Sequence, residues 1–219
     1  MLTAEAEWLE ARLAGLTRAD APLLNVGSAS AAFRREVQPW IEARVFAPLS
    51  RREIAVLHQD LAPAPGVDLV GDLGDPAVCA EIARHGVRSI VCSNVLEHVV
   101  ERERIAGALA ALLPPGGRLF VTVPHRFPHH PDPIDTMYRP TVPELLALFP
   151  ALRLVASAAL PCGRLHDLVL QNPRRLIEKL GERSAARRAG PSPLRAAVRW
   201  LPWIVRPFVV TCAELVKPR

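Results

Sequence analysis

Residues 23–30 form the segment that most constrains how this chain can fold. The segment starts with apolar residues typical of a buried strand and continues into Gly27, Ser28 and Ala29, after which a helical pattern begins. A strand that passes into a helix through small residues brings backbone N–H groups close to a ligand. Nucleotide-binding loops usually carry two or three glycines and this one carries a single glycine, so its interpretation depends on the segments further along the chain.

Further strand patterns occur at regular intervals. Apolar runs predict strands over 22–27, 54–60, 67–73, 87–93 and 117–123. Helical periodicity predicts helices over 3–16 with Thr3 as N-cap, 30–47, 75–85, 101–113 and, after Thr141, up to Phe149. This alternation predicts a parallel sheet layered between helices. Only residues 61–66 separate the second strand from the third, which is too short for a helical crossover, so we expect a helix to be missing and the third strand to be a stub.

The end of the predicted sheet is an antiparallel pair. Segments 152–160 and 164–171 are apolar and flank a Pro-Cys-Gly turn. From residue 172 the pattern becomes helical and basic. We therefore predict one domain over 1–171 and a basic, amphipathic C-terminal extension over 172–219.

Two blocks carry a resemblance to a known family. The fourth predicted strand runs into V-L-E-H-V at 95–99, and the fifth follows the turn P-P-G-G at 114–117. In this order the chain resembles the class I S-adenosylmethionine-dependent methyltransferases, especially their bacterial V-L-E-H-V branch, over roughly residues 20–160. The resemblance implies an α/β fold, a Rossmann-like open and mainly parallel sheet with a C-terminal antiparallel hairpin and helices on both faces. It also implies S-adenosylmethionine as the cofactor.

The resemblance further implies which residues bind the cofactor. Ligands of open α/β sheets bind at the carboxyl ends of the strands. The implied residues are Asn25, Gly27, Ser28, Asp60, Asp72, Leu73, Ser93 and Asn94. Asp60 would bind the ribose hydroxyls, and Asp72 would contact the adenine. Two positions depart from the family pattern, since Asn25 stands where an acidic residue is usual and Ala29 where a second glycine is usual.

Histidines supply the candidates for acid–base chemistry. Methyl transfer is an in-line displacement, so the protein mainly positions the reactants and provides a base where the acceptor is a hydroxyl. His125, directly after the fifth predicted strand, is the preferred base, and His98 is the second candidate. For Glu97 beside it, a role in complementing a helix dipole stays open.

The Pro-rich loop 125–140 is expected to cover the substrate. Its candidate substrate-binding residues are His129, His130, Tyr138 and Arg139. The imidazoles and carboxylates of this loop are also metal ligands, but no H-x-x-x-H spacing fixes two of them on one helix face, so we predict no metal. A purely structural role for the prolines, with exposed histidines, stays open.

Composition bounds the remaining possibilities. A chain of 219 residues with 50% hydrophobic residues can bury one core and carry a short appendage. Its four cysteines lack C-x-x-C spacing, and its first residues predict a helix rather than a signal peptide, so a cytoplasmic protein is expected.

The charge is unevenly distributed along the chain. Residues 151–219 hold 13 Lys and Arg against 4 Asp and Glu, net +9, whereas residues 1–150 hold 14 Lys and Arg against 18 Asp and Glu, net −4. The acidic first part argues against nucleic acid as the substrate.

The basic extension needs its own explanation. Residues 172–190 place arginines around apolar residues, and residues 200–212 are apolar and aromatic but interrupted by two prolines and Arg206. That interruption argues against a membrane-spanning helix. Contact with an anionic membrane surface and packing onto the domain or a second subunit, as in a homodimer, both stay open.

The sequence therefore predicts a methyltransferase that acts on a small or lipid-linked acceptor, such as a sugar hydroxyl of an envelope precursor, peripheral to the inner membrane. Two other classes stay open. One is an inactive scaffold protein of this fold at the membrane surface, which the single-glycine loop favours. The other is a nucleic-acid-modifying enzyme that uses the basic extension.

Overall fold

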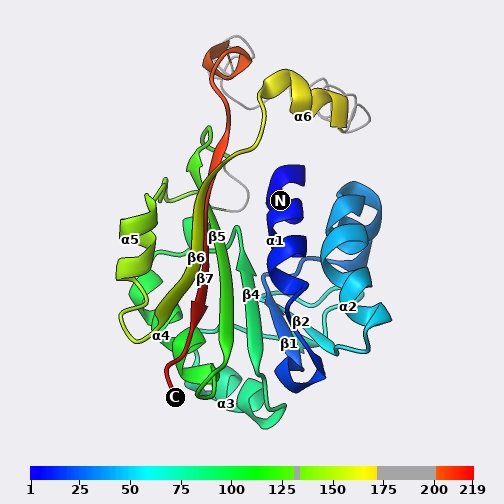
Figure 1. Ribbon diagram of the computed structural model, residues 1–219, viewed down its shortest axis with the longest axis vertical. Helices are drawn as coiled ribbons and strands as arrows, with labels where there is room; N and C mark the ends of the chain where they lie inside the picture. The colour runs from blue at the N-terminus through cyan, green and yellow to red at the C-terminus, as the bar shows by residue number, and fades with distance from the viewer. Residues whose placement is uncertain (131–133, 172–200) are drawn as a thin grey trace, which may run out of the picture.

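The computed structural model describes residues 1–130, 134–171 and 201–219; residues 131–133 and 172–200 lie outside the described residues. The described chain is built around a seven-stranded sheet (Figure 1). In chain order the strands are β1 (Leu23–Val26), β2 (Val56–Asp60), β3 (Leu69–Val70), β4 (Ser89–Ser93), β5 (Arg118–Arg126), β6 (Arg153–Pro161) and β7 (Val209–Val216).

The strand order is β3-β2-β1-β4-β5-β7-β6. Strands β1 to β5 pair with one another in parallel, whereas β7 runs antiparallel to both β5 and β6. This arrangement confirms the predicted fold class, a mainly parallel open sheet that ends in an antiparallel hairpin.

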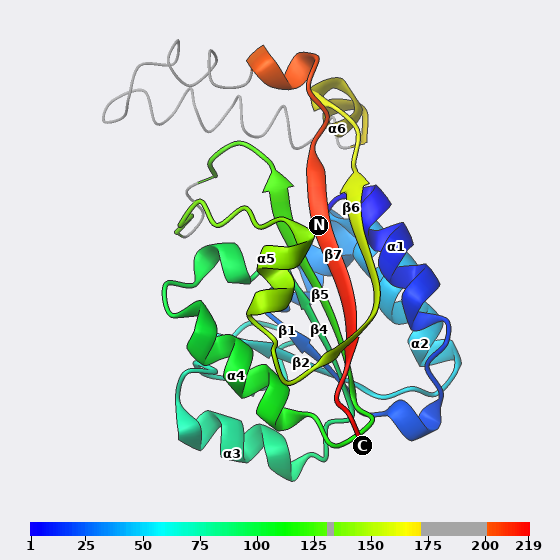
Figure 2. The ribbon, with the colours of Figure 1, turned by 60° about the vertical axis from the view of Figure 1, so that its left-hand side comes forward.

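Helices cover both faces of the sheet (Figure 2). One face carries α1 (Thr3–Leu13), the π-helical turns η2 (Phe33–Val37) and η3 (Ile41–Phe46), and α2 (Ala47–Arg51). The other face carries α3 (Pro76–Arg84), α4 (Arg102–Leu112) and α5 (Val142–Ala147). The remaining short elements are η1 (Arg18–Asp20), η4 (Leu96–His98), α6 (Leu165–Gln171) and η5 (Leu201–Ile204).

The sheet has a separate hydrophobic core on each face because successive side chains of a strand point to opposite sides. Leu23 and Phe120 pack with α1 and η3, whereas their chain neighbours Leu24 and Val121 pack with α3 and α4. All four side chains are fully buried. The central strands therefore read as continuous apolar runs, as is typical of parallel sheets covered on both faces.

Two predictions about helices are wrong. The helix expected over 30–47 is interrupted at Gln38, which has φ −131° and ψ 69° and precedes Pro39. A residue before proline is biased out of the helical region, which explains the break. The N-cap of α1 is Leu2 rather than the expected Thr3, and the Glu5 carboxylate accepts the backbone N–H of Leu2 at 3.0 Å.

The prediction for the second strand of the hairpin is also wrong. Residues 165–171 form helix α6, at whose start the Asp167 carboxylate accepts the Arg164 N–H at 2.8 Å. The strand that pairs with β6 is β7, which belongs to the segment predicted as an extension. Short apolar runs do not distinguish a strand from a helix by periodicity, which explains the error. The part of the predicted extension over 209–216 thus lies inside the sheet, while its residues 172–200 lie outside the described residues.

The connection between β2 and β3 is as short as predicted. Residues 61–68, all of which the structure describes, form no helix, and β3 has two residues. Among the helices of the described residues, none has the length and apolar character required to cross a bilayer.

Candidate functional site

The loops that follow β1 and β4 touch at the carboxyl edge of the sheet. Gly27 has φ +65°, and a Cβ added to it would lie 2.5 Å from Val95 Cγ2. Both the positive φ and the close approach therefore require glycine here. This contact brings the first predicted cofactor loop to the V-L-E-H-V block.

The loop after β2 joins the same edge through Asp60. Its Oδ2 accepts the Ala29 N–H at 2.7 Å and its Oδ1 accepts the Ala62 N–H at 3.4 Å. Ser28 N donates to Gln59 O at 2.9 Å. Three of the predicted cofactor-binding residues, Gly27, Ser28 and Asp60, are thus adjacent in space.

Arg34 holds these loops together and was not singled out from the sequence. Its guanidinium is buried and donates to the carbonyl oxygens of Ser28 at 3.0 Å, Ala29 at 2.6 Å and Gly66 at 2.8 Å. Burial lowers the pKa of Arg34. A single arginine in an amphipathic pattern carries no sequence signal for such a role, because solvated arginines look the same.

Asn25 lies on β1 and pairs across the sheet rather than with the loops. Its Nδ2 is 3.0 Å from Nδ1 of His58, the residue opposite on β2. Burial, followed by the charge of Arg34, lowers the pKa of His58 to about 4. Neutral His58 therefore accepts a hydrogen bond from Asn25, which explains the amide at this position.

The other predicted pair at this end, Asp72 and Leu73, follows β3. Asp72 is exposed, and its Oδ1 accepts the Gly74 N–H at 2.7 Å within its own turn. The Leu73 side chain is buried in the core beside α3 and α4. The described contacts do not join either side chain to Gly27 or Asp60.

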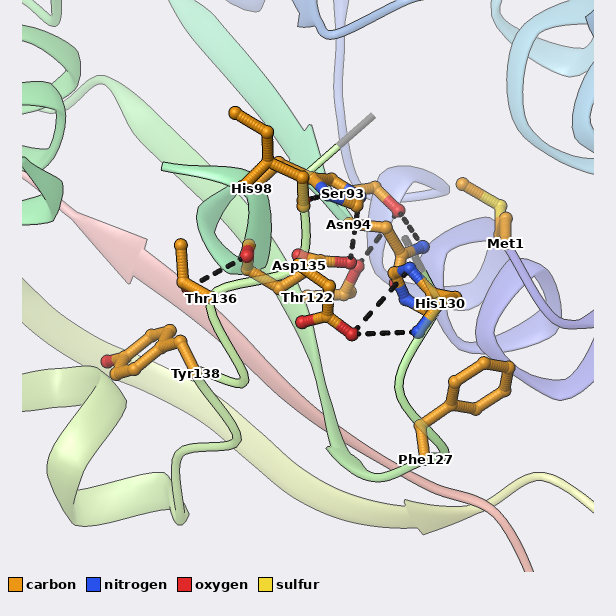
Figure 3. A network of polar contacts seen from close by, with 12 residues as sticks. Met1, Ser93, Asn94, His98, Thr122, Phe127, His130, Asp135, Thr136 and Tyr138 are labelled. Atoms are coloured by element: carbon orange, nitrogen blue, oxygen red, sulfur yellow. Dashed lines mark hydrogen bonds and ion pairs between the residues drawn. The ribbon is translucent and has the colours of Figure 1, made fainter. Parts of the chain in front are cut away.

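Ser93 and Asn94, at the end of β4, form a polar network with Thr122, which pairs with Ser93 in the middle of β5 (Figure 3). Its centre is Glu5 of α1, which is fully buried. Glu5 Oε1 accepts hydrogen bonds from Ser93 Oγ and Asn94 Nδ2, each at 2.8 Å, and from Thr122 Oγ1. No sequence pattern indicates this role, since Glu5 looks like an ordinary acidic residue of a first helical turn.

Beside this network lie Glu97, His98 and His130, each of which offers one ligand atom within 4.8 Å of the others. Glu97 is fully buried, and neither of its carboxylate oxygens has a hydrogen-bond partner among the described residues. Burial, followed by the nearby Glu5, raises the pKa of Glu97 to about 8. His98 and His130 were predicted for different roles, and the structure brings them together, with ring centroids 5.2 Å apart.

The loop after β5 is organised by an ion pair. Arg139 Nη1 lies 3.1 Å from Asp135 Oδ1 and Nη2 lies 2.6 Å from Oδ2. The same carboxylate accepts the N–H groups of His130 at 3.0 Å and Met137 at 2.8 Å. Burial by itself would raise the pKa of Asp135, but these hydrogen bonds, Arg139 first, hold it well below its usual range. Arg139, predicted to recognise a substrate, thus has its charge paired inside the loop.

The remaining predicted residues are dispersed. Tyr138 lies apart from Ser93 and His130 (Figure 3), with the Arg102 guanidinium 4.6 Å from its ring centroid. His125 donates from Nδ1 to the carbonyl oxygens of Arg139 at 3.2 Å and Pro140 at 3.0 Å. His129, before His130, is half-buried.

A cavity elsewhere in the chain does not belong to this site. Its volume is about 530 Å³, and Cys79, Val87, Leu112 and Pro114 are among its lining residues. Val87 precedes β4 and Pro114 precedes β5, so this cavity lies toward the amino ends of the strands, opposite to where ligands of open α/β sheets bind.

Comparison with known proteins gives structural neighbours only. No protein-family model matches the chain, and no curated protein matches it. Coclaurine N-methyltransferase bound to N-methylheliamine and SAH matches with a TM-score of 0.58 at 11% identity, over 97% of this chain and 70% of that chain. An S-adenosylmethionine-dependent methyltransferase from Mesorhizobium loti matches with a TM-score of 0.51 at 15% identity, over 96% and 97% of the two chains.

A third neighbour, the [4+2]-cyclase SpnF, matches with a TM-score of 0.53 at 17% identity, over 97% of this chain and 81% of that chain. These matches confirm, for the fold, the resemblance to class I S-adenosylmethionine-dependent methyltransferases. Because a fold hosts several chemistries, as the cyclase illustrates, the reaction has to be argued from the site.

Proposed function

We propose that this chain is an S-adenosylmethionine-dependent methyltransferase that acts on a small-molecule acceptor. The observation that carries the proposal is the meeting of three loops at one carboxyl edge. The loop after β1 contacts the loop after β4 through Gly27 and Val95, and the loop after β2 through Ala29 and Asp60. In a sheet of this kind that edge is the ligand-binding edge.

The residues at this edge fit the cofactor chemically. The two oxygens of a carboxylate offer about four lone-pair sites, and Asp60 uses two of them for backbone N–H groups, so acceptors remain for a ribose diol. The buried Glu5 carboxylate supplies negative charge toward a cationic sulfonium. S-adenosylmethionine, when bound, supplies an electrophilic methyl group.

The chain's own residues contribute position and a base. Ser93, Asn94 and Thr122 are fixed by Glu5, so the polar groups nearest the methionine end of the cofactor are preorganised. We propose His125 as the base for a hydroxyl acceptor. Because its Nδ1 donates to two carbonyl oxygens, the lone pair is on Nε2, the atom that would receive the proton.

Ligand binding tests this proposal directly. Thermal unfolding with S-adenosylmethionine or S-adenosylhomocysteine should show a raised Tm, because a ligand at 100 times its Kd stabilises by about 2.7 kcal/mol. Asp60→Asn should reduce the shift, whereas Glu81→Gln, an exposed carboxylate of α3, should not. No shift with either ligand at millimolar concentration would reject the proposal.

A second candidate function is a protein of this fold that binds without turnover. The observation that favours it is that Ser93 and Asn94 already hydrogen-bond to Glu5. Such a protein would show no methylated product with any acceptor tested, even where S-adenosylhomocysteine raises its Tm.

We further propose that the acceptor is lipid-linked and that the segment 172–219, apart from its buried strand β7, contacts an anionic membrane from the inner face. Support comes from the net charge of residues 151–219 and from the apolar residues Leu201, Ile204 and Val205, all at least half exposed. In Figure 1, α6, which ends at Gln171, and η5, which belongs to this segment, lie beyond the end of the sheet. Cosedimentation with phosphatidylglycerol vesicles should exceed that with neutral vesicles, and Leu201→Ser with Val205→Ser should reduce it. A dimer in size-exclusion chromatography without vesicle binding would instead support a second copy as the partner.

A further inference from the structure

Three side chains at the carboxyl edge form a cluster that methyl transfer by itself does not require. Glu97 and His98 belong to η4 after β4, and His130 belongs to the loop after β5. Their ligand atoms all lie within 4.8 Å of one another. One carboxylate and two imidazoles are a donor set typical of first-row transition metals and zinc.

Glu97 provides a second and independent indication of a ligand. The residue is fully buried, and both carboxylate oxygens lack a hydrogen-bond partner within the described part of the chain. Burying a carboxylate without a partner is strongly unfavourable. A cation bound between Glu97 and the histidines would supply the missing partner.

The two imidazoles are arranged as metal ligands usually are. His98 Nδ1 contacts the carbonyl oxygen of Ile134, so this nitrogen carries the proton and Nε2, which lies 3.8 Å from Glu97 Oε1, carries the lone pair. His130 Nδ1 faces Asp135 Oδ2 at 3.9 Å, beyond hydrogen-bond distance, and the same oxygen accepts the His130 backbone N–H at 3.0 Å. Metal-binding histidines commonly present their other nitrogen to a backbone carbonyl or a carboxylate in this way.

We propose that Glu97, His98 and His130 bind one divalent transition-metal or zinc ion. Asp135, which is held by Arg139, positions His130 and does not itself coordinate. Three protein ligands leave coordination positions open, as in catalytic rather than structural zinc sites. The next step rests on the proposed function: an oxygen of the methyl acceptor would occupy the open coordination positions. Such a site would favour acceptors with a carboxylate or neighbouring hydroxyls.

This proposed site differs from the sequence-based expectation of no metal. Within the loop 125–140 alone, the spacing fixes no pair of histidines. Two of the three ligands come instead from η4, which follows β4 and lies more than thirty residues earlier in the chain. Only the pairing of β4 with β5 brings them to His130.

The test uses the full chain, stripped with a chelator and titrated with ZnCl2 by calorimetry and with CoCl2 by visible absorption. We expect one ion per chain and a cobalt spectrum of low coordination number. Glu97→Gln, His98→Ala and His130→Ala should each weaken binding at least tenfold, and Asp135→Asn should weaken it about 10–100-fold. His85→Ala, an exposed histidine at the end of α3, should bind as the wild type does.

Two measurements keep the test decisive. Glu97→Gln keeps the size of the side chain and breaks no hydrogen bond, so without metal it should unfold at the same Tm as the wild type, while zinc should no longer raise that Tm. Equal zinc affinity in the wild type and in all three ligand variants would overturn the proposal. The zinc titration contains no S-adenosylmethionine, so its result does not depend on cofactor binding. If the chain binds zinc but not S-adenosylmethionine, only the proposed function is refuted. If it binds S-adenosylmethionine but not zinc, only the metal site is refuted.

Discussion

Replacing Glu5 by alanine should destabilise the fold far more than replacing Glu7, its neighbour on α1. The Glu7 side chain is 52% exposed and forms a 3.2 Å ion pair with Arg44. The Glu5 side chain is buried and accepts four hydrogen bonds. The donors are Leu2 N, Ser93 Oγ, Asn94 Nδ2 and Thr122 Oγ1.

The size of the effect depends on the donors that lose their partner. Without Glu5, Thr122 Oγ1 and Asn94 Nδ2 can still donate to Ser93 Oγ, at 2.9 Å and 3.2 Å, so the loss falls on the Leu2 N–H and the Ser93 hydroxyl. Each buried donor without a partner costs about 1–3 kcal/mol, which gives a loss of about 4 kcal/mol in the free energy of unfolding for Glu5→Ala. An exposed ion pair contributes at most about 1 kcal/mol, so Glu7→Ala should lower the free energy of unfolding by no more than that.

Urea unfolding with linear extrapolation measures both variants. Helix α1 is also anchored by Arg12, whose Nε lies 2.6 Å from Glu214 Oε2 on β7, so Glu5→Ala should still fold. Glu5→Gln keeps one acceptor oxygen and should fall between the two alanine variants. If Glu5→Ala and Glu7→Ala differ by less than about 1 kcal/mol, the buried network does not stabilise this edge and the reasoning is refuted.

Two further predictions concern the first strand and its partner. Because burial lowers the pKa of His58 from 6.5 to about 4, the unfolded chain binds a proton that the folded chain does not, so the free energy of unfolding should fall as the pH drops through this range. Allowing for the partial exposure of His58, we expect the free energy of unfolding to fall by about 2 kcal/mol. If the free energy of urea unfolding of His58→Gln depends on pH as that of the wild type does, this prediction is wrong. Gly27→Ala should cost about 3 kcal/mol, because it combines a positive φ with the 2.5 Å approach to Val95. A double-mutant cycle with Val95→Ala should recover the steric part, and strict additivity would argue against the contact.

The candidate site was predictable only where its residues stand at strand ends. Gly27, Ser28 and Asp60 were identified because each lies at the end of an apolar run, and parallel strands bring such positions to one edge. Arg34 and Glu5 were missed because a charged residue in a helical pattern looks the same whether it faces solvent or a buried network.

Local sequence was sufficient to specify the alternation of strands and helices, the parallel core of the sheet and the edge of the sheet at which the loops after β1, β2 and β4 meet. These features depend on apolar periodicity, which reports the face that each segment buries. Three-dimensional packing was needed to establish that β7 at 209–216 enters between β5 and β6, that Glu5 meets Ser93, and that Glu97 and His98 meet His130. Such contacts join residues far apart along the chain, and their choice of partner depends on packing between elements, which no local pattern encodes.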